Sequence, residues 1–212
     1  MCGRFLLRCP PENWPADLLG GDDDALQMPK LFEPRQNISP TQNVLAITAS
    51  VDGTRSLQAF RWGLVPPWAD DLKIGASMIN ARSETVDEKP SFRKSFLQRR
   101  CLIPADGYYE WITRDKKKYP MRIERPGREV FCFAGLYERN ESLDVSSCTI
   151  ITAGAGDSLR WIHDRTPLVI APTNYPRWLD PNFRERETLK GMLSAPGDDF
   201  FEADEVEKVT GR

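Results

Sequence analysis

The stretch between residues 101 and 153 constrains the fold more than any other part of the chain. Its β-rich segments are separated by short turns and comprise Cys101–Thr113, Tyr119–Glu124, Glu129–Tyr137 and Ser147–Ala153. Asp-Lys, Pro-Gly and Asn-Glu pairs mark the turns between them. Many strands joined by short turns, with a few helices added, predict an α+β protein built around an antiparallel sheet or barrel.

The flanking segments add a hairpin and several short helices to this core. Val44–Ser50 and Ser56–Trp62 surround an Asp-Gly pair and predict a β-hairpin. The other predicted elements are a helix over Pro11–Gly21, a loop from Asp22 to Pro40, a basic amphipathic helix over Pro90–Arg100, a buried strand over Leu168–Ala171, and helices over Tyr175–Trp178 and Glu185–Leu193. Because the chain shows no internal repeat and no break in composition, residues 1–212 predict a single domain, with an antiparallel sheet or barrel as its core and peripheral helices.

Composition argues against several classes of protein. Hydrophobic residues make up 40% of the chain and charged residues 28%, which is typical of a globular protein with a substantial core. The sequence has no signal peptide and no apolar run of about 20 residues, so we expect a cytoplasmic protein without a membrane partner. The cysteines have no CxxC or Cys/His spacing, which argues against a disulfide framework and a metal site. Cys101, Cys132 and Cys148 lie in apolar runs and are predicted to fill the core.

The first residues, MCGRF, hold an unusual nucleophile. Removal of Met1 would leave a free α-amine and a thiol on the same residue, Cys2, which makes a 1,2-aminothiol. An internal cysteine cannot combine these two groups. Three further stretches place polar residues where core or turn residues are expected: Ile79–Thr85, Ala105–Trp111 and Ile162–Pro167.

Two residues in these stretches suit proton transfer. His163 is the single histidine of the chain and lies beside an Asp-Arg pair, although a lone histidine is also compatible with a purely structural role. Glu110 lies between Tyr109 and Trp111, and aromatic surroundings raise the pKa of a carboxyl toward the range useful for a general acid. An outward-facing strand residue explains Glu110 equally well.

Aromatic and basic residues suggest a surface for nucleic acid. Trp62–Trp68 (WGLVPPW) is either a rigid packed loop or a platform on which nucleobases stack. Basic residues at Arg4, at Arg82, within Pro90–Arg100 and within Lys116–Lys118 either contact phosphates or form solvated faces. The net charge of −2 does not by itself indicate a nucleic-acid partner.

Taken in order, these motifs resemble the SRAP family, named for SOS response-associated peptidase. The resemblance spans nearly the whole chain and rests on MCGRF, NISPTQ (Asn37–Gln42), RWGLVPPW (Arg61–Trp68), INARSET (Ile79–Thr85), CLIPADGYYEW (Cys101–Trp111), ITAGAG (Ile151–Gly156) and IHDRTPLVI (Ile162–Ile170). It implies an α+β fold with a β-barrel-like core. The last segment, Glu205–Arg212, is shorter than the family's usual end, so we expect a shortened C-terminal edge.

The resemblance also implies a function. The family binds single-stranded DNA and bonds covalently to abasic sites, which shields the lesion during replication. We therefore expect single-stranded DNA with abasic sites as the partner, no cofactor, and a monomer that is associated with the nucleoid when bound to DNA. By resemblance, the catalytic residues are Cys2, Asn80, Glu110 and His163. By the same resemblance, the residues that contact DNA are Arg4, Arg82, Pro40, Trp68 and Trp111.

The chemistry of an abasic site explains these residue types. An α-amine with a pKa near ~7.7–8.0 is partly neutral at cellular pH and can condense with the aldehyde of the opened sugar. The thiol of the same residue then closes a five-membered thiazolidine, and such proximity contributes ~7–11 kcal/mol at best. Glu110 would serve ring opening and crosslink reversal, His163 would move protons at the imine, and Asn80 would orient Cys2 or the sugar.

Two other functions stay open. A thiol peptidase would use Cys2 as nucleophile and His163 as base, acting mainly in self-removal of Met1, and it predicts cleavage of an added peptide if it acts in trans. A non-catalytic single-strand binding module would use Trp62, Trp68 and Trp111. It predicts salt-sensitive, reversible binding to intact DNA without a need for Cys2.

Overall fold

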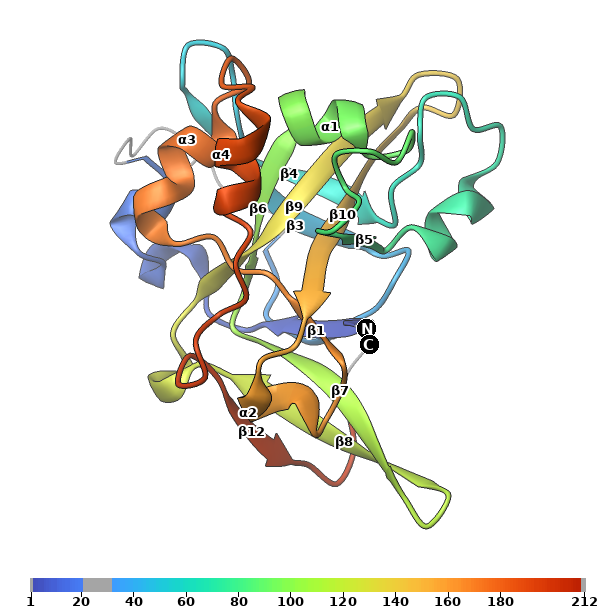
Figure 1. Ribbon diagram of the computed structural model, residues 1–212, viewed down its shortest axis with the longest axis vertical. Helices are drawn as coiled ribbons and strands as arrows, with labels where there is room; N and C mark the ends of the chain where they lie inside the picture. Colours follow the sequence, from blue (N-terminus) through green and yellow to red (C-terminus); the bar gives the residue numbers. More distant parts are fainter. Residues whose placement is uncertain (1, 21–31, 211–212) are drawn as a thin grey trace.

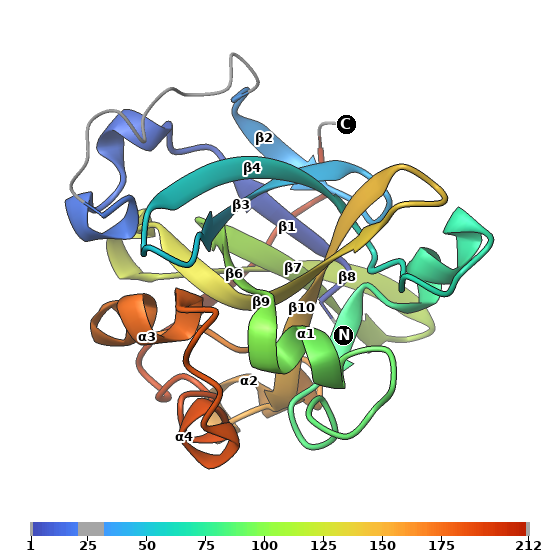
Figure 2. The same cartoon turned by 90° about the horizontal axis from the view of Figure 1, so that it is seen from above.

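Five strands of the chain close into a barrel (Figures 1 and 2). The computed structural model describes residues 2–20 and 32–210. The barrel strands are β3 (Asn43–Ala49), β4 (Arg55–Trp62), β6 (Arg100–Ala105), β9 (Phe131–Asn140) and β10 (Val145–Gly154). They follow the order β10-β4-β3-β6-β9, and the antiparallel pairing of β9 with β10 closes the ring. The β4–β10 pair is parallel and the other pairs of the ring are antiparallel, so the predicted α+β fold with a barrel core is confirmed with one parallel seam.

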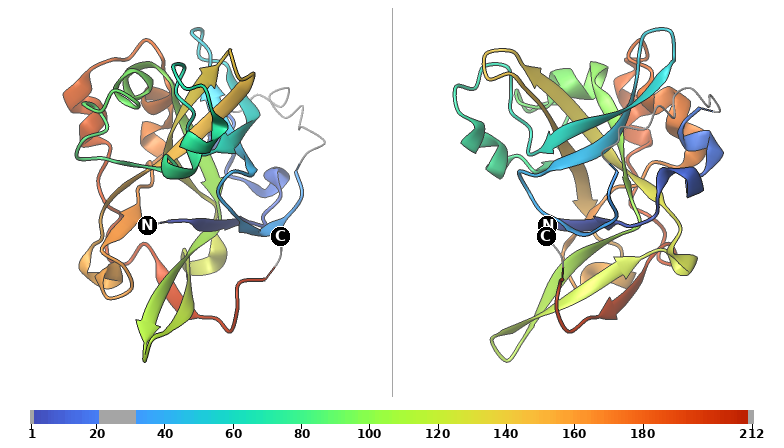
Figure 3. Two further views of the ribbon diagram at one scale, coloured as in Figure 1. Left: turned by 90° about the vertical axis from the view of Figure 1, so that its right-hand side faces the viewer. Right: turned by 180° about the vertical axis from the view of Figure 1, so that it is seen from behind.

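A second sheet lies across one end of the barrel (Figure 3). Its strands follow the order β12-β8-β7-β1-β2 and comprise β12 (Glu202–Glu205), β8 (Lys117–Glu124), β7 (Gly107–Arg114), β1 (Arg4–Leu7) and β2 (Arg35–Ile38). The ring of Phe5 on β1 meets Trp62 and Phe133 edge-on, with ring centres 5.1 and 5.8 Å apart. Tyr108 on β7 meets Phe133 in the same way at 6.2 Å. These aromatic contacts fix β1 and β7, and therefore the start of the chain, against the barrel.

The interior of the barrel is apolar, as the sequence predicts. Cys101, Cys132 and Cys148 are fully buried, which confirms their assignment to the core. Ile47 on β3 and Leu102 on β6 face each other across the ladder and are also fully buried. Burial of such side chains is the main favourable contribution to folding, so this apolar interior stabilises the barrel that carries the loops.

Two short strands attach to β10 near its carboxyl end. β5 (Asn80–Arg82) runs parallel to β10 and β11 (Arg165–Pro167) runs antiparallel to it. Both pair with Thr152, β5 through Arg82 and β11 through Pro167. Strand β10 therefore separates and aligns the two motifs INARSET and IHDRTP.

The helices are short and lie outside the barrel (Figure 1). They are α1 (Arg93–Gln98), α2 (Asp157–Arg160), α3 (Tyr175–Leu179) and α4 (Arg186–Gly191). Helices α3 and α4 lie on one flank of the barrel, and α1 packs on β9 and β6. Within the two described ranges, no helix combines the length and apolar character needed to span a bilayer.

Several predicted elements differ from the structure. The predicted loop from Asp22 to Pro40 contains β2, an edge strand that pairs with β1 and gives little hydrophobic signal, because three of its residues in a row are polar. Residues 21–31 of that loop lie outside the described residues. The predicted strand over Leu168–Ala171 is wrong, because the ladder with β10 ends at Pro167 and only Val169 makes an isolated bridge, to Phe133.

The predicted N-terminal helix and the predicted basic helix are also shorter than expected. Pro11–Gly21 contains 3₁₀ turns at Pro11–Asn13 and Ala16–Leu18 instead of one helix, and Gly21 is outside the described residues. The helix predicted over Pro90–Arg100 is reduced to α1, because Arg100 already pairs with β9 as the first residue of β6.

Candidate active site

Cys2 lies directly before β1 and is held by the strand that carries Asn80. The Cys2 side chain is fully buried, and its Sγ lies 3.9 Å from the Arg4 carbonyl oxygen. Asn80 Nδ2 donates a hydrogen bond of 2.9 Å to the Cys2 carbonyl oxygen. The position of Asn80 is fixed in turn by Trp62, whose indole N–H donates to the carbonyl of Ile79 at 2.9 Å. The barrel therefore sets the position of Cys2 through the side-chain amide of Asn80.

The other end of the Asn80 amide faces the same region. Asn80 Oδ1 is buried and has no hydrogen-bond partner within residues 2–20 and 32–210. A buried amide oxygen without a donor is unfavourable by about 1–3 kcal/mol. This oxygen is therefore a ready acceptor for an N–H group that enters the site beside Cys2.

Glu110 lies on β7 beside the start of β1. Its neighbour Tyr109 pairs with Arg4, and the Glu110 side chain is only 5% exposed, so the outward-facing alternative is wrong. Burial raises the pKa of Glu110 above its usual range, and the charge of His163 acts in the opposite direction. Burial, followed by the charge of Glu110, also raises the pKa of the Cys2 thiol. These mutual effects show that Glu110 is electrostatically coupled to both Cys2 and His163.

His163 lies in the turn between α2 and β11 and is partly exposed. Its Nδ1 accepts a hydrogen bond of 2.9 Å from the Arg165 backbone N–H. The same Nδ1 lies 2.8 Å from Asp164 Oδ1. A nitrogen that accepts a hydrogen bond from an N–H carries no proton, so the Arg165 contact requires the neutral ring with its proton on Nε2. The Asp164 contact instead requires a ring that is protonated at Nδ1.

The basic residues predicted to contact DNA lie beside these groups. Arg4 is on β1, two residues after Cys2, and its Nη1 donates to Asn37 Oδ1 at 3.0 Å. Arg82 is exposed at the end of β5, two residues after Asn80. Each arginine therefore extends from a strand that also holds a candidate catalytic residue.

A hollow with several charged side chains adjoins Asn80. Its lining residues are Asn80, Arg82, Glu84, Thr85, Lys89, Phe92 and Arg165. Three cations face one carboxylate there, and that carboxylate, Glu84, is bound to Arg165. The sequence reasoning did not single out Glu84 or Arg165, although both lie inside motifs that it quoted. The hollow has the charge to accept a phosphodiester backbone.

The residues predicted to shape the DNA groove lie on three different segments of the chain. Trp68 lies in the loop after β4 and is 59% exposed. Trp111 follows Glu110 on β7 and is partly exposed, and Pro40 follows β2 and is also partly exposed. Both packed and platform features therefore occur in Trp62–Trp68, because Trp62 is buried and Trp68 is not.

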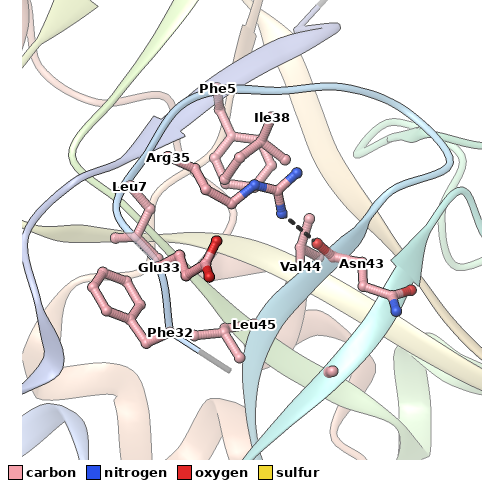
Figure 4. Close-up of a pocket in the computed structure, with 10 residues that line it drawn as sticks. Phe5, Leu7, Phe32, Glu33, Arg35, Ile38, Asn43, Val44 and Leu45 are labelled. Carbon is pink, nitrogen blue, oxygen red and sulfur yellow. Dashed lines mark hydrogen bonds between the residues drawn. The ribbon is translucent and has the colours of Figure 1, made fainter. Parts of the chain in front are cut away.

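A separate apolar hollow of about 400 Å³ lies on the other side of β1 (Figure 4). Phe5 and Leu7 line it together with Ile38 and Val44, and Arg35 donates to the Asn43 carbonyl at 2.6 Å within it. It contains none of the candidate catalytic residues. Among the described residues, no group of three or more His, Cys, Asp or Glu side chains could hold a metal ion.

Comparisons with known proteins agree on one family. The whole chain, residues 1–212, matches the profile of the SOS response associated peptidase (SRAP) family. It is 41% identical to the abasic site processing protein YoaM of Bacillus subtilis, over 99% of this chain and 92% of that protein. It is 29% identical to the abasic site processing protein HMCES of Xenopus tropicalis, over 85% and 66%. A crystal structure of a phage-related protein from Bordetella bronchiseptica superposes with a TM-score of 0.77 at 26% identity, over 98% and 95% of the two chains.

Proposed function

The chain belongs to the SOS response associated peptidase family, and we propose that it processes abasic sites by bonding Cys2 covalently to the lesion in single-stranded DNA. The names of its relatives, which are abasic site processing proteins, support the lesion as substrate. One observation carries the covalent role of Cys2. The residue exposed as the new N-terminus by removal of Met1 is held by Asn80 and is electrostatically coupled to Glu110. A protein of this kind acts in the response to DNA damage.

The proposed reaction proceeds in two condensation steps without oxidation or reduction. The neutral α-amine of Cys2 attacks the C1′ aldehyde of the ring-opened sugar, and loss of water gives an imine. The Cys2 sulfur then adds to the imine carbon, its proton passes to the nitrogen, and a thiazolidine results. Since amine and thiol belong to one residue, the second step is intramolecular and needs no further positioning of a second reactant.

The side chains around Cys2 suit the proton transfers of these steps. Because burial raises the pKa of Glu110, this carboxyl can hold a proton closer to neutral pH and release it to the ring oxygen during opening. In the contact with Arg165, His163 is neutral with its proton on Nε2, so it can donate a hydrogen bond to the departing hydroxyl of the carbinolamine, while the Glu110 carboxyl supplies the proton that leaves with the water. Asn80 holds the Cys2 carbonyl, which keeps the α-amine in a fixed direction.

The proposed DNA path runs past the basic and aromatic residues. Arg4 and Arg82 would neutralise phosphates on either side of the lesion. Trp68 offers an exposed face for stacking of a neighbouring base, and Trp111 and Pro40 would shape the groove. A single strand also spares the protein the free energy of unstacking a base from a duplex.

The burial and the protonation of the Cys2 thiol argue against a peptidase that acts on added substrates. Trans cleavage of peptides needs a thiolate that an added substrate can reach. The Cys2 side chain is fully buried and its thiol pKa is raised, which disfavours both conditions. We infer that any peptidase activity is limited to the Met1–Cys2 bond, and incubation with an unrelated peptide followed by mass spectrometry checks this.

The deciding experiment is covalent capture on a denaturing gel. Protein whose mass confirms the loss of Met1 is mixed with a single-stranded oligonucleotide that carries one abasic site. We expect a heat-resistant shifted band that is absent with intact DNA and with Cys2→Ala. Cys2→Ser keeps the α-amine but lacks the sulfur, so it should give a band only after borohydride reduction of the imine. If protein without Met1 gives no band, the crosslinking function is wrong, and a native-gel shift alone would support the binding module instead.

A further inference from the structure

We propose that Glu84 is a positioning residue that acts through Arg165 to fix the place and the tautomer of His163. The inference rests on the proposed function, because it gives His163 a reason to need a fixed tautomer. Glu84 belongs to the INARSET motif but is not one of the four candidate catalytic residues. Its role follows from a continuous series of contacts that leads from its carboxylate to the imidazole.

The first contact in the series is a forked ion pair. Arg165 Nη1 lies 2.5 Å from Glu84 Oε1, and Nη2 lies 3.0 Å from Glu84 Oε2. Nη2 also donates to the Thr152 carbonyl oxygen at 2.7 Å. Paired parallel hydrogen bonds of this kind restrict orientation as well as adding energy. The Arg165 side chain is 15% exposed and the Glu84 side chain 50%, so the pair is only partly shielded from water and restricts Arg165 mainly through its forked geometry.

The second contact joins Arg165 to the imidazole. The Arg165 backbone N–H donates to His163 Nδ1, and this bond selects the tautomer with the proton on Nε2. Asp164 lies within 2.8 Å of the same Nδ1 and favours the opposite assignment, with the proton on Nδ1. The balance between these two neighbours depends on where residue 165 is held. Glu84 and Thr152 hold it, and they therefore bias the ring toward Nε2–H.

The same ion pair also joins the two halves of the candidate site. Glu84 follows β5, four residues after Asn80, whereas Arg165 begins β11, two residues after His163. Strand β10 lies between β5 and β11. The side-chain pair bridges over β10 and sets the separation between the segments that carry Asn80 and His163. The hydrogen bond from Arg165 lowers the pKa of Glu84, which keeps this bridge ionised at neutral pH.

The single histidine makes the tautomer directly measurable. Only His163 contributes imidazole nitrogens, so a long-range ¹H–¹⁵N NMR spectrum holds one pair of ring signals. At a pH where the ring is neutral, we expect the wild-type spectrum to show the Nε2–H tautomer. Glu84→Gln should shift both nitrogen signals toward the averaged values of a free imidazole. Glu88→Gln removes the same charge from an exposed carboxylate of the same segment and should leave the spectrum unchanged. Identical spectra for wild type and Glu84→Gln would overturn the proposal, whatever the protein does to DNA.

Crosslinking kinetics give the second, independent readout. A general acid or base contributes ~10²–10⁴-fold to a rate, so we expect Glu84→Gln to slow crosslinking at saturating DNA by at least about tenfold. Its affinity for intact single-stranded DNA should not fall, because the substitution removes a negative charge from the hollow that also holds Arg82 and Lys89. Arg165→Lys keeps the charge but loses the fork and should show the same imidazole shift, whereas Glu84→Asp should recover part of the rate. A variant with a normal imidazole spectrum and a reduced rate would place Glu84 in DNA binding and refute the positioning role. A failure of the wild type to crosslink would refute the proposed function alone, because the NMR comparison still decides the role of Glu84.

Discussion

Asn140 holds the loop that carries Trp68, and replacement by aspartate changes only the side-chain nitrogen that makes this contact. Asn140 ends β9 and is fully buried. Its Nδ2 donates to the carbonyls of Pro66 and Ala69 at 2.7 and 2.9 Å, and its Oδ1 accepts from Ser142 and from the Leu143 backbone N–H. Pro66 and Ala69 close a turn around Trp68 through a backbone hydrogen bond of 3.0 Å. The amide therefore uses all its bonding capacity to hold this turn on the barrel.

The magnitude of the Asn140→Asp change follows from these partners. An ionised carboxylate would face two carbonyl oxygens without a proton between them, so the folded protein must protonate it. Holding a carboxyl with an ordinary pKa near 3.9 protonated at pH 7 costs about 4 kcal/mol. The neutral acid restores one of the two donor bonds, and the bond still missing is worth about 1 kcal/mol. The expected loss of stability at pH 7 is thus about 5 kcal/mol.

The sign of the pH dependence is opposite to that of a salt-bridged aspartate. The introduced carboxyl has a higher pKa in the folded state than in the unfolded state, so the folded state binds the additional proton. Its destabilisation is largest at neutral pH and declines by about 1.4 kcal/mol for each pH unit toward pH 4, where about 1 kcal/mol remains. Chemical denaturation of wild type and Asn140→Asp at several pH values measures this slope. A deficit that does not change between pH 4 and pH 7 would refute the assignment of both Nδ2 bonds.

Three further outcomes are expected. Glu110→Gln should slow crosslinking by about 10²-fold or more. The raised pKa of Glu110 destabilises the folded wild type as pH rises above the usual carboxyl range. The melting temperature of this variant should therefore exceed that of wild type at neutral pH and approach it in acid. Trp68→Ala should weaken binding of intact single-stranded DNA by about 1–3 kcal/mol in a fluorescence titration, with an unchanged melting temperature. The Arg100 guanidinium is buried and donates to four backbone carbonyls, so Arg100→Met should lower the free energy of unfolding by about 3 kcal/mol, while the crosslinking rate of the folded protein stays that of wild type.

The fold was largely predictable because its core elements have strong local patterns. The hairpin of β3 and β4 follows from two β-rich runs on either side of Asp52–Gly53, and the structure pairs the two strands in full register from Asn43 to Ala49. The burial of Glu110 was also readable from the sequence, because strand alternation places it on the face of Tyr108 and Ile112, which are both buried. Its two immediate neighbours are aromatic and concealed this pattern. Alternation at i±2 is thus the better guide to the environment of a strand carboxylate.

The edge strands and the long-range contacts were not predictable from local pattern. β2 has an exposed Gln36 and no apolar alternation, so only its pairing with β1 makes it a strand. The ion pair of Glu84 with Arg165 joins residues 81 positions apart, and the bond from Asn80 to Cys2 spans 78 positions. Neither contact has a signature in a single sequence, because the ion pair depends on how β10 aligns β5 and β11, and the bond to Cys2 depends on how the sheet of β1 packs against the barrel. The family resemblance indicated the residues of the site, while only the structure supplied their connections.

The environment of Cys2 also favours an order of events in the proposed reaction. Burial and the charge of Glu110 both act against a thiolate at Cys2, so the sulfur is protonated while the site waits for DNA. An α-amine has an ordinary pKa near ~7.7–8.0 and is partly neutral at the same pH. The amine is therefore the first nucleophile, and the thiol becomes competent when imine formation places an electrophilic carbon beside it and Glu110 or the imine nitrogen can take its proton. A thiol kept protonated until that moment is also poorly reactive toward oxidants and alkylating agents, since the thiolate is the reactive form. The burial that disfavours Cys2 as a peptidase nucleophile thus suits the proposed reaction, in which the residue reacts once, at one lesion.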